Sequence, residues 1–83
     1  DIVARQRFLE TVRRVAREGT TVILITHHVE EIIPEIDRVV LLDRGRVAAA
    51  GPKHEMLTAA RLTTLFGAPV SVSTNNGYFV AHA

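Results

Sequence analysis

The residues with the clearest potential for chemistry lie in one short stretch, residues 21–31, with the sequence TVILITHHVEE. Residues 20–26 are β-branched and apolar without alternation, which is typical of a strand covered on both faces in a parallel sheet. Ligands of open α/β sheets bind at the carboxyl ends of strands, so His27 would face a substrate. Spacing alone favours a simpler interpretation, a polar residue where a strand meets a helix.

A metal site is another interpretation of the same stretch. His27 and Glu31 are four residues apart, which places them on one face of a helix. No third ligand is evident, and the absence of cysteine excludes disulfides and thiolate zinc sites. The sequence therefore predicts no metal site.

Two other features imitate catalytic motifs. Asp43 follows four apolar residues, like the magnesium-binding carboxylate of phosphate-loop NTPases, but Arg44-Gly45 comes next. We therefore expect Asp43 to open a tight turn. Ser71 and Ser73 have no histidine or acid beside them, so neither is expected to be an activated nucleophile.

The chain lacks a phosphate-binding loop. That motif needs a Gly-Lys pair followed by Ser or Thr. The only lysine is Lys53, which stands between Pro52 and His54. No Gly-rich stretch could cradle phosphates through backbone amides. By its residues alone, the chain is an α/β fragment without an active site.

The elements that position these residues follow from apolar spacing and from turn residues. The parallel strand needs neighbours on both edges, and this chain offers few. The arginines of the first helix are interpreted as a solvated face, and Tyr78 and Phe79 as packing residues. The expected elements are a helix over residues 2–18, a strand over 20–26, a short helix over 29–33, a hairpin of strands at 38–42 and 46–50, short helices at 53–57 and 58–66, and a hairpin over 70–80 turning at Asn76-Gly77.

Composition narrows the class of protein. The 83 residues are 47% apolar with a net charge of +1, a field too weak to indicate binding to nucleic acid. No apolar run is long enough to span a membrane. A chain of this size buries about 60–65% of the surface that it exposes when unfolded, so an independent core would be thin.

These residues together resemble a known family. Residues 21–31 resemble the switch-histidine segment of ABC-transporter ATPases, where a buried strand ends in Thr-His before a helix with one or two glutamates. Residues 37–47 (DRVVLLDRGRV) are similar to the hairpin that follows in that family, and residues 50–57 resemble its next short helix. Asp1 stands at the right distance upstream to be the closing Asp of the family's D-loop. The departure is His28, where the family more often has Asp.

The resemblance implies a fold and a domain organisation. It covers residues 1–66 and leaves residues 67–83 as a C-terminal hairpin extension. The whole chain, residues 1–83, would be the C-terminal portion of an ABC ATPase domain, a phosphate-loop NTPase of the α/β class. The tail from Gly67 onward resembles importer ATPases for iron chelates or related metal cargo. The family's phosphate loop, Gln loop, signature motif and magnesium-binding Asp with its catalytic Glu would all precede Asp1.

The resemblance also implies site residues and partners. His27 would be the switch histidine, which contacts the γ-phosphate, and Asp1 would lie at the interface of the ATPase dimer. The parent would bind ATP and Mg²⁺ with a second ATPase subunit beneath transmembrane permease subunits, and would power transport. It would be cytoplasmic, held at the inner face of the membrane by its partners without inserting itself. Alone, the chain would bind neither ligand and hydrolyse no ATP.

Two rival functions remain open. One is a stand-alone α/β module that binds a protein partner, with His27 incidental. The other is a regulatory role, in which the C-terminal segment modulates dimerisation of the parent. In either case the unpartnered apolar strand at residues 20–26 would recruit other chains, so we expect the isolated chain to self-associate.

Overall fold

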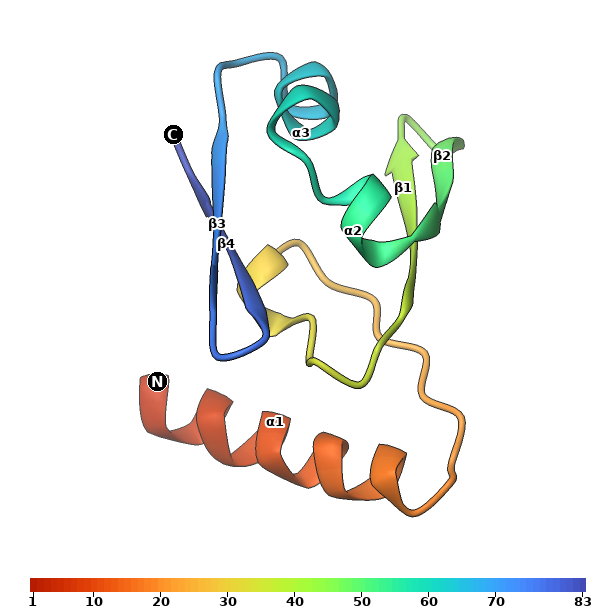
Figure 1. Cartoon of the computed structure of the whole chain (residues 1–83), viewed down its shortest axis with the longest axis vertical. Coiled ribbons are helices and arrows are strands. Elements are labelled where there is room, and N and C mark those ends of the chain that lie inside the picture. Colours follow the sequence, from red (N-terminus) through yellow and green to blue (C-terminus); the bar gives the residue numbers. More distant parts are fainter.

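The computed structural model describes all 83 residues. One helix, α1, lies along one end of the molecule, and the remaining elements are grouped on one side of it (Figure 1). None of the helices combines the length and apolar character needed to cross a bilayer. The elements in chain order are α1 (Ile2–Arg17), the 3-10 helix η1 (Val29–Glu31), β1 (Arg38–Asp43), β2 (Arg46–Pro52), α2 (Lys53–Met56), α3 (Ala59–Phe66), β3 (Ser71–Asn75) and β4 (Tyr78–His82).

The first predicted helix is confirmed as α1. Its N-terminus is capped by Asp1, whose Oδ1 accepts the backbone N–H of Val3 at 2.9 Å and of Ala4 at 3.4 Å. An aspartate suits this position because its carboxylate satisfies N–H groups that lack partners within the helix. Leu9 is buried, and the chain leaves the helix through Gly19 at a φ of 95°.

The predicted hairpin at residues 38–50 is confirmed. β1 and β2 pair antiparallel, with Asp43 opposite Arg46 across the turn. The two turn residues, Arg44 and Gly45, both have positive φ, 53° and 76°, as a tight two-residue hairpin requires. Asp43 is exposed beside this turn, so the prediction that it opens a turn is also confirmed.

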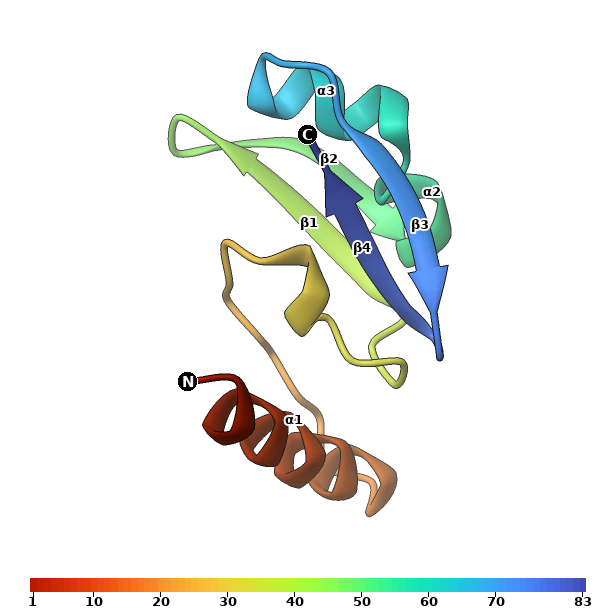
Figure 2. The ribbon, with the colours of Figure 1, turned by 90° about the vertical axis from the view of Figure 1, so that its left-hand side faces the viewer.

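The tail forms the second predicted hairpin, β3 with β4, around a turn of the same type at Asn76 and Gly77. A Cβ on Gly77 would lie 3.0 Å from Cγ of Pro34, so the tip of this hairpin packs closely on the segment after η1. Figure 1 shows the two hairpins on opposite sides of α2 and α3, and Figure 2 shows the β3–β4 hairpin in front of the β1–β2 hairpin.

The core is small. Its main cluster is built by η1, β1, α2 and α3, and the tail hairpin packs against it through Val72, Phe79 and Ala81. Only eight of the 83 residues are buried, so this core is thin for independent stability. The buried members of the cluster are Val29, Leu41, Met56, Leu57 and Leu62.

The predicted parallel-sheet strand over residues 20–26 does not form. Both sheets of the structure are two-stranded and antiparallel, and residues 20–26 pair with neither. The side chains of Ile23 and Ile25 are consequently 86% and 90% exposed. The physical reason is that a parallel strand needs partners on its edges and cover on its faces, and no other segment of this chain supplies them. The α/β class itself holds, with helices and antiparallel hairpins.

Candidate functional site

His27 lies at a bend between the extended segment 20–26 and η1, and it is exposed. Its imidazole makes no hydrogen bond or ion pair within the chain. His28 is the residue before η1, in an extended conformation, and its side chain makes no capping bond either. The His27 ring is therefore free to contact a group outside this chain.

The backbone that follows His27 is held by side chains. The backbone N–H of His28 donates to Oγ1 of Thr26 at 3.0 Å, and the Thr26 hydroxyl donates to Oε1 of Glu31. Oε2 of Glu31 pairs with Nε of Arg5 on α1 at 3.2 Å. The sequence pattern does not predict this network, because no local signal indicates that the segment after His27 lies beside the first helix.

Asp1 and His27, the two predicted site residues, are not in direct contact. Asp1 caps α1, and Arg5 lies one turn further along, where its backbone N–H donates to the Asp1 carbonyl at 3.0 Å. The structure thus joins the two predicted positions indirectly, through α1 and the pair of Arg5 with Glu31.

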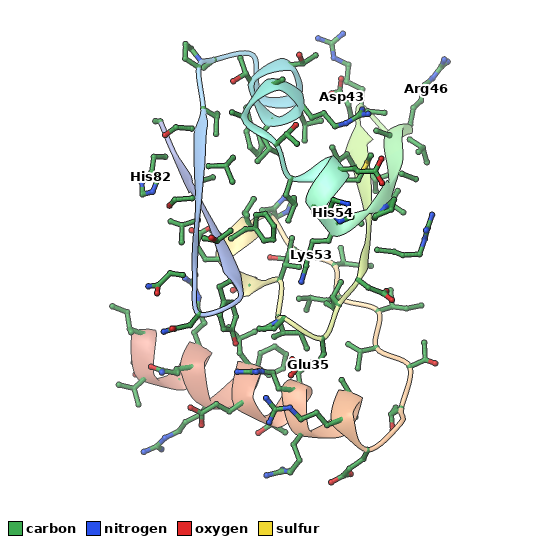
Figure 3. All side chains as sticks on the ribbon, viewed as in Figure 1. Glu35, Asp43, Arg46, Lys53, His54 and His82 are labelled. Carbon is green, nitrogen blue, oxygen red and sulfur yellow. The ribbon has the colours of Figure 1, made fainter.

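A second acidic residue, Glu35, ties the same segment to α1. Nε of Arg13 lies 2.9 and 3.1 Å from its two carboxylate oxygens, and Nε of Arg17 lies 2.9 Å from Oε2. Figure 3 shows Glu35 pointing from its loop toward α1. The hydrogen bond from Arg13 lowers the pKa of Glu35 below its ordinary value and raises the pKa of Arg13.

Arg5 and Arg17 are exposed, as expected for a solvated face, although each also pairs with a glutamate, whereas Arg13 is half-buried in its pair with Glu35 and departs from that interpretation. The i, i+4 spacing of Arg13 and Arg17 was a signal for a shared acidic partner, because such residues project from one face of a helix. Arg13 also lies over the ring of Tyr78, 5.8 Å from its centroid, so the tail hairpin joins the same contact.

Lys53, the only lysine, has an internal role. Its Nζ donates to the carbonyl of Pro34 at 3.1 Å and lies 5.8 Å from the centroid of the Phe79 ring. Burial lowers the pKa of this ammonium. A hollow of about 510 Å³ opens beside it, between α2, residues 34–37 and the tail hairpin (Figure 3). Neither His27 nor Asp1 lines that hollow.

No group of three or more His, Cys, Asp or Glu side chains lies close enough to hold a metal ion. The carboxylate of Glu31, which the metal interpretation required, is engaged by Thr26 and Arg5. The only lysine ammonium, on Lys53, already has a carbonyl partner.

The arrangement nevertheless defines a class of protein. An apolar extended segment ends in Thr26-His27, leads into a short helix and is followed by the hairpin of β1 and β2. With α1 before it, this is the order of elements that the resemblance to ABC-transporter ATPases implies for the C-terminal part of their domain.

Comparison with curated proteins identifies the family. The chain is 36% identical over 77 residues to the uncharacterised ABC transporter ATP-binding protein YlmA of Bacillus subtilis, covering 90% of this chain and 29% of that protein. It is 42% identical over 67 residues to the hemin import ATP-binding protein HmuV of Rhodococcus jostii, covering 76% of this chain and 23% of HmuV. A putative ABC transporter ATP-binding protein of Streptococcus mutans is 32% identical over 74 residues, covering 87% of this chain and 28% of that protein.

The chain therefore belongs to the family of ABC transporter ATP-binding proteins, as a C-terminal part of such a subunit. It spans 23–29% of the length of these three relatives. No protein-family model matches the chain.

Proposed function

We propose that this chain supplies the switch-histidine part of an ATP-hydrolysing subunit, in which hydrolysis of ATP drives transport of a substrate across a membrane. One observation carries the proposal: the His27 side chain is exposed and makes no hydrogen bond within the chain. It stands at the end of an apolar segment whose Ile23 and Ile25 are also exposed. Ile23 and Ile25 present apolar surface that the central sheet of a full-length subunit would cover.

His27 has the chemistry that this role needs. Phosphoryl transfer depends on positioning and on donors aimed at developing charge, and the protein forms no covalent bond. A ring N–H of His27 would donate to an oxygen of the γ-phosphate and help to hold the attacking water. When the γ-phosphate leaves, that bond is lost and the following helix is free to shift. Asp1, at the N-terminus of α1, would face the second ATPase subunit.

The partners follow from the same proposal. ATP and Mg²⁺ would bind chiefly through residues of the full-length subunit outside this chain, since the chain has no Gly-Lys pair and no group of three or more metal-ligating side chains. Two ATPase subunits would act beneath transmembrane permease subunits on the cytoplasmic face of the membrane. Alone, the chain would be inactive. The name of HmuV and the resemblance of the tail beyond Gly67 favour haem or another iron chelate as the cargo.

Transport by the full-length subunit tests this function directly. Reconstituted with its permease in vesicles, the subunit should hydrolyse ATP in the presence of Mg²⁺ and drive uptake of haem or an iron chelate. A sugar serves as the control cargo and should not be taken up. If the vesicles took up the sugar but no haem or iron chelate, the proposed cargo would be wrong. If the subunit hydrolysed no ATP, the proposed function would be wrong.

Self-association of the isolated chain is a second expected outcome. The exposed, unpaired segment 20–26 offers backbone edges and apolar side chains to other copies. Light scattering should show a mass that rises with concentration, and replacing both Ile23 and Ile25 by Thr should reduce it. The matched control is Val40→Thr, because Val40 lies on β1, which is already paired with β2. A stable monomer of the unmodified chain at all concentrations would contradict the prediction.

A further inference from the structure

The bonds around His27 form a short chain of contacts that begins at the backbone N–H of the next residue, His28. The hydroxyl of Thr26, the residue before His27, accepts the N–H of His28, the residue after it, at 3.0 Å. A threonine hydroxyl has one proton to donate, and here the carboxylate of Glu31 receives it. Two residues that flank His27 are thereby locked to each other and to η1.

Glu31 links this local structure to α1. Its Oε1 accepts from Thr26 and its Oε2 pairs with Arg5 at 3.2 Å, so both carboxylate oxygens are engaged. The Glu31 side chain is 23% exposed, so water competes with these bonds less than at an open surface. Glu30, the preceding residue, is exposed and its side chain makes no such bond, although it belongs to the same 3-10 helix.

The direction of an imidazole depends on the backbone that carries it. His27 lies at a bend, where neither a helix nor a strand pairing fixes the backbone dihedrals. The bonds made by Thr26 hold the backbone next to His27, together with the bond from the Glu31 backbone N–H to the His28 carbonyl at 3.1 Å. A donor that acts on a transition state must be held close to its productive geometry, since displacement by about 1 Å can cost a hundredfold in rate.

We propose that Thr26 and Glu31 are positioning residues for His27, and that Arg5 anchors them to α1. The inference rests on the proposed function of His27 as the contact to the γ-phosphate. Neither residue needs to touch the nucleotide. Their effect is to hold the imidazole in the direction in which it meets the phosphate before ATP arrives.

The test uses the full-length subunit and two opposed changes at one position. Thr26→Val keeps the branched shape and removes the hydroxyl, whereas Thr26→Ser keeps the hydroxyl and removes the methyl group. If the hydrogen bonds matter, Thr26→Val should lower turnover on the order of tenfold to a hundredfold, and Thr26→Ser should stay near the unmodified rate. ATP affinity should change by less than about twofold in both, because the phosphate loop carries most of that affinity.

Glu31→Ala should lower turnover to a similar extent, and the double variant with Thr26→Val should lose little more than either single change. Glu30→Ala is the matched control and should leave turnover unchanged. The inference is overturned if Thr26→Val turns over normally, if Thr26→Ser is as slow as Thr26→Val, or if Glu30→Ala loses as much as Glu31→Ala. The inference is also overturned if Thr26→Val lowers ATP affinity and melting temperature together with turnover. A purely structural role of Thr26 predicts that all three fall.

His27→Ala separates this inference from the function on which it rests. A loss of turnover in His27→Ala together with normal turnover in Thr26→Val rejects only the positioning role. Normal turnover in His27→Ala rejects the proposed role of His27 itself, and with it the reason for positioning the ring.

Discussion

Replacing His27 by alanine in the full-length subunit is expected to lower ATP turnover by about a hundredfold or more, with ATP affinity nearly unchanged. Removing one preorganised donor to a transition state typically costs on the order of 10²–10³ in rate. The His27 ring has no partner within this chain, so its loss breaks no internal bond. Nucleotide titration, steady-state hydrolysis and a melting temperature together measure the three quantities.

His28→Ala is the matched control for that change. His28 is also an exposed histidine, one residue along, and only its backbone takes part in the bond to Thr26. Its side chain should therefore affect turnover much less. If His27 were only a polar residue at a junction, both changes would lower stability slightly and neither would act selectively on hydrolysis. Near-normal turnover in His27→Ala would remove the main residue-level support for the proposed function.

The isolated 83-residue chain is expected to bind ATP with Mg²⁺ no better than about 1 mM, the range of weak and nonspecific contacts. It has no Gly-Lys pair to hold the phosphates, and no cluster of carboxylates to hold the metal. Lys53 is not a substitute, because its ammonium donates to the carbonyl of Pro34 and is partly buried. Calorimetric titration measures this affinity.

Lys53→Ala provides the internal control for the binding experiment. If the chain lacks a nucleotide site, the variant should bind ATP as weakly as the unmodified chain and differ only in stability. A micromolar dissociation constant in the unmodified chain would contradict the prediction, and its loss in Lys53→Ala would place the missing phosphate contact at that residue.

Elements specified by short-range signals could be predicted from the sequence. The sequence predicts a short helix over residues 58–66, and α3 runs from Ala59 to Phe66 with Thr58 Oγ1 accepting the N–H of Arg61 at 3.2 Å. Gly67 takes the left-handed conformation at φ 71°. Such signals work because a cap or a tight turn is decided by the side chain and dihedrals of a few adjacent residues.

The conformation of residues 20–26 could not be predicted in the same way, and the strand expected there does not form. The β-branched, apolar composition of this segment favours a strand buried on both faces. A sheet forms only when another strand supplies the backbone hydrogen-bond partners. In this chain the segment remains unpaired, and Ile23 and Ile25 stay exposed. The composition of residues 20–26 therefore indicates that they favour a buried strand, but the absence of a pairing strand in this chain leaves them unpaired.

The sequence by itself determined the identity of the candidate site, because Thr26-His27 and the residues that follow it carry the resemblance to ABC-transporter ATPases. Only the tertiary structure decided what surrounds that histidine. The pairing of Arg5 with Glu31 brings together residues 26 positions apart. The pairing of Arg13 with Glu35 joins residues 22 apart. Spacing along the chain predicts contacts within one helix or hairpin. Ion pairs between elements depend on how α1 packs against the rest, and a local pattern carries no information on that.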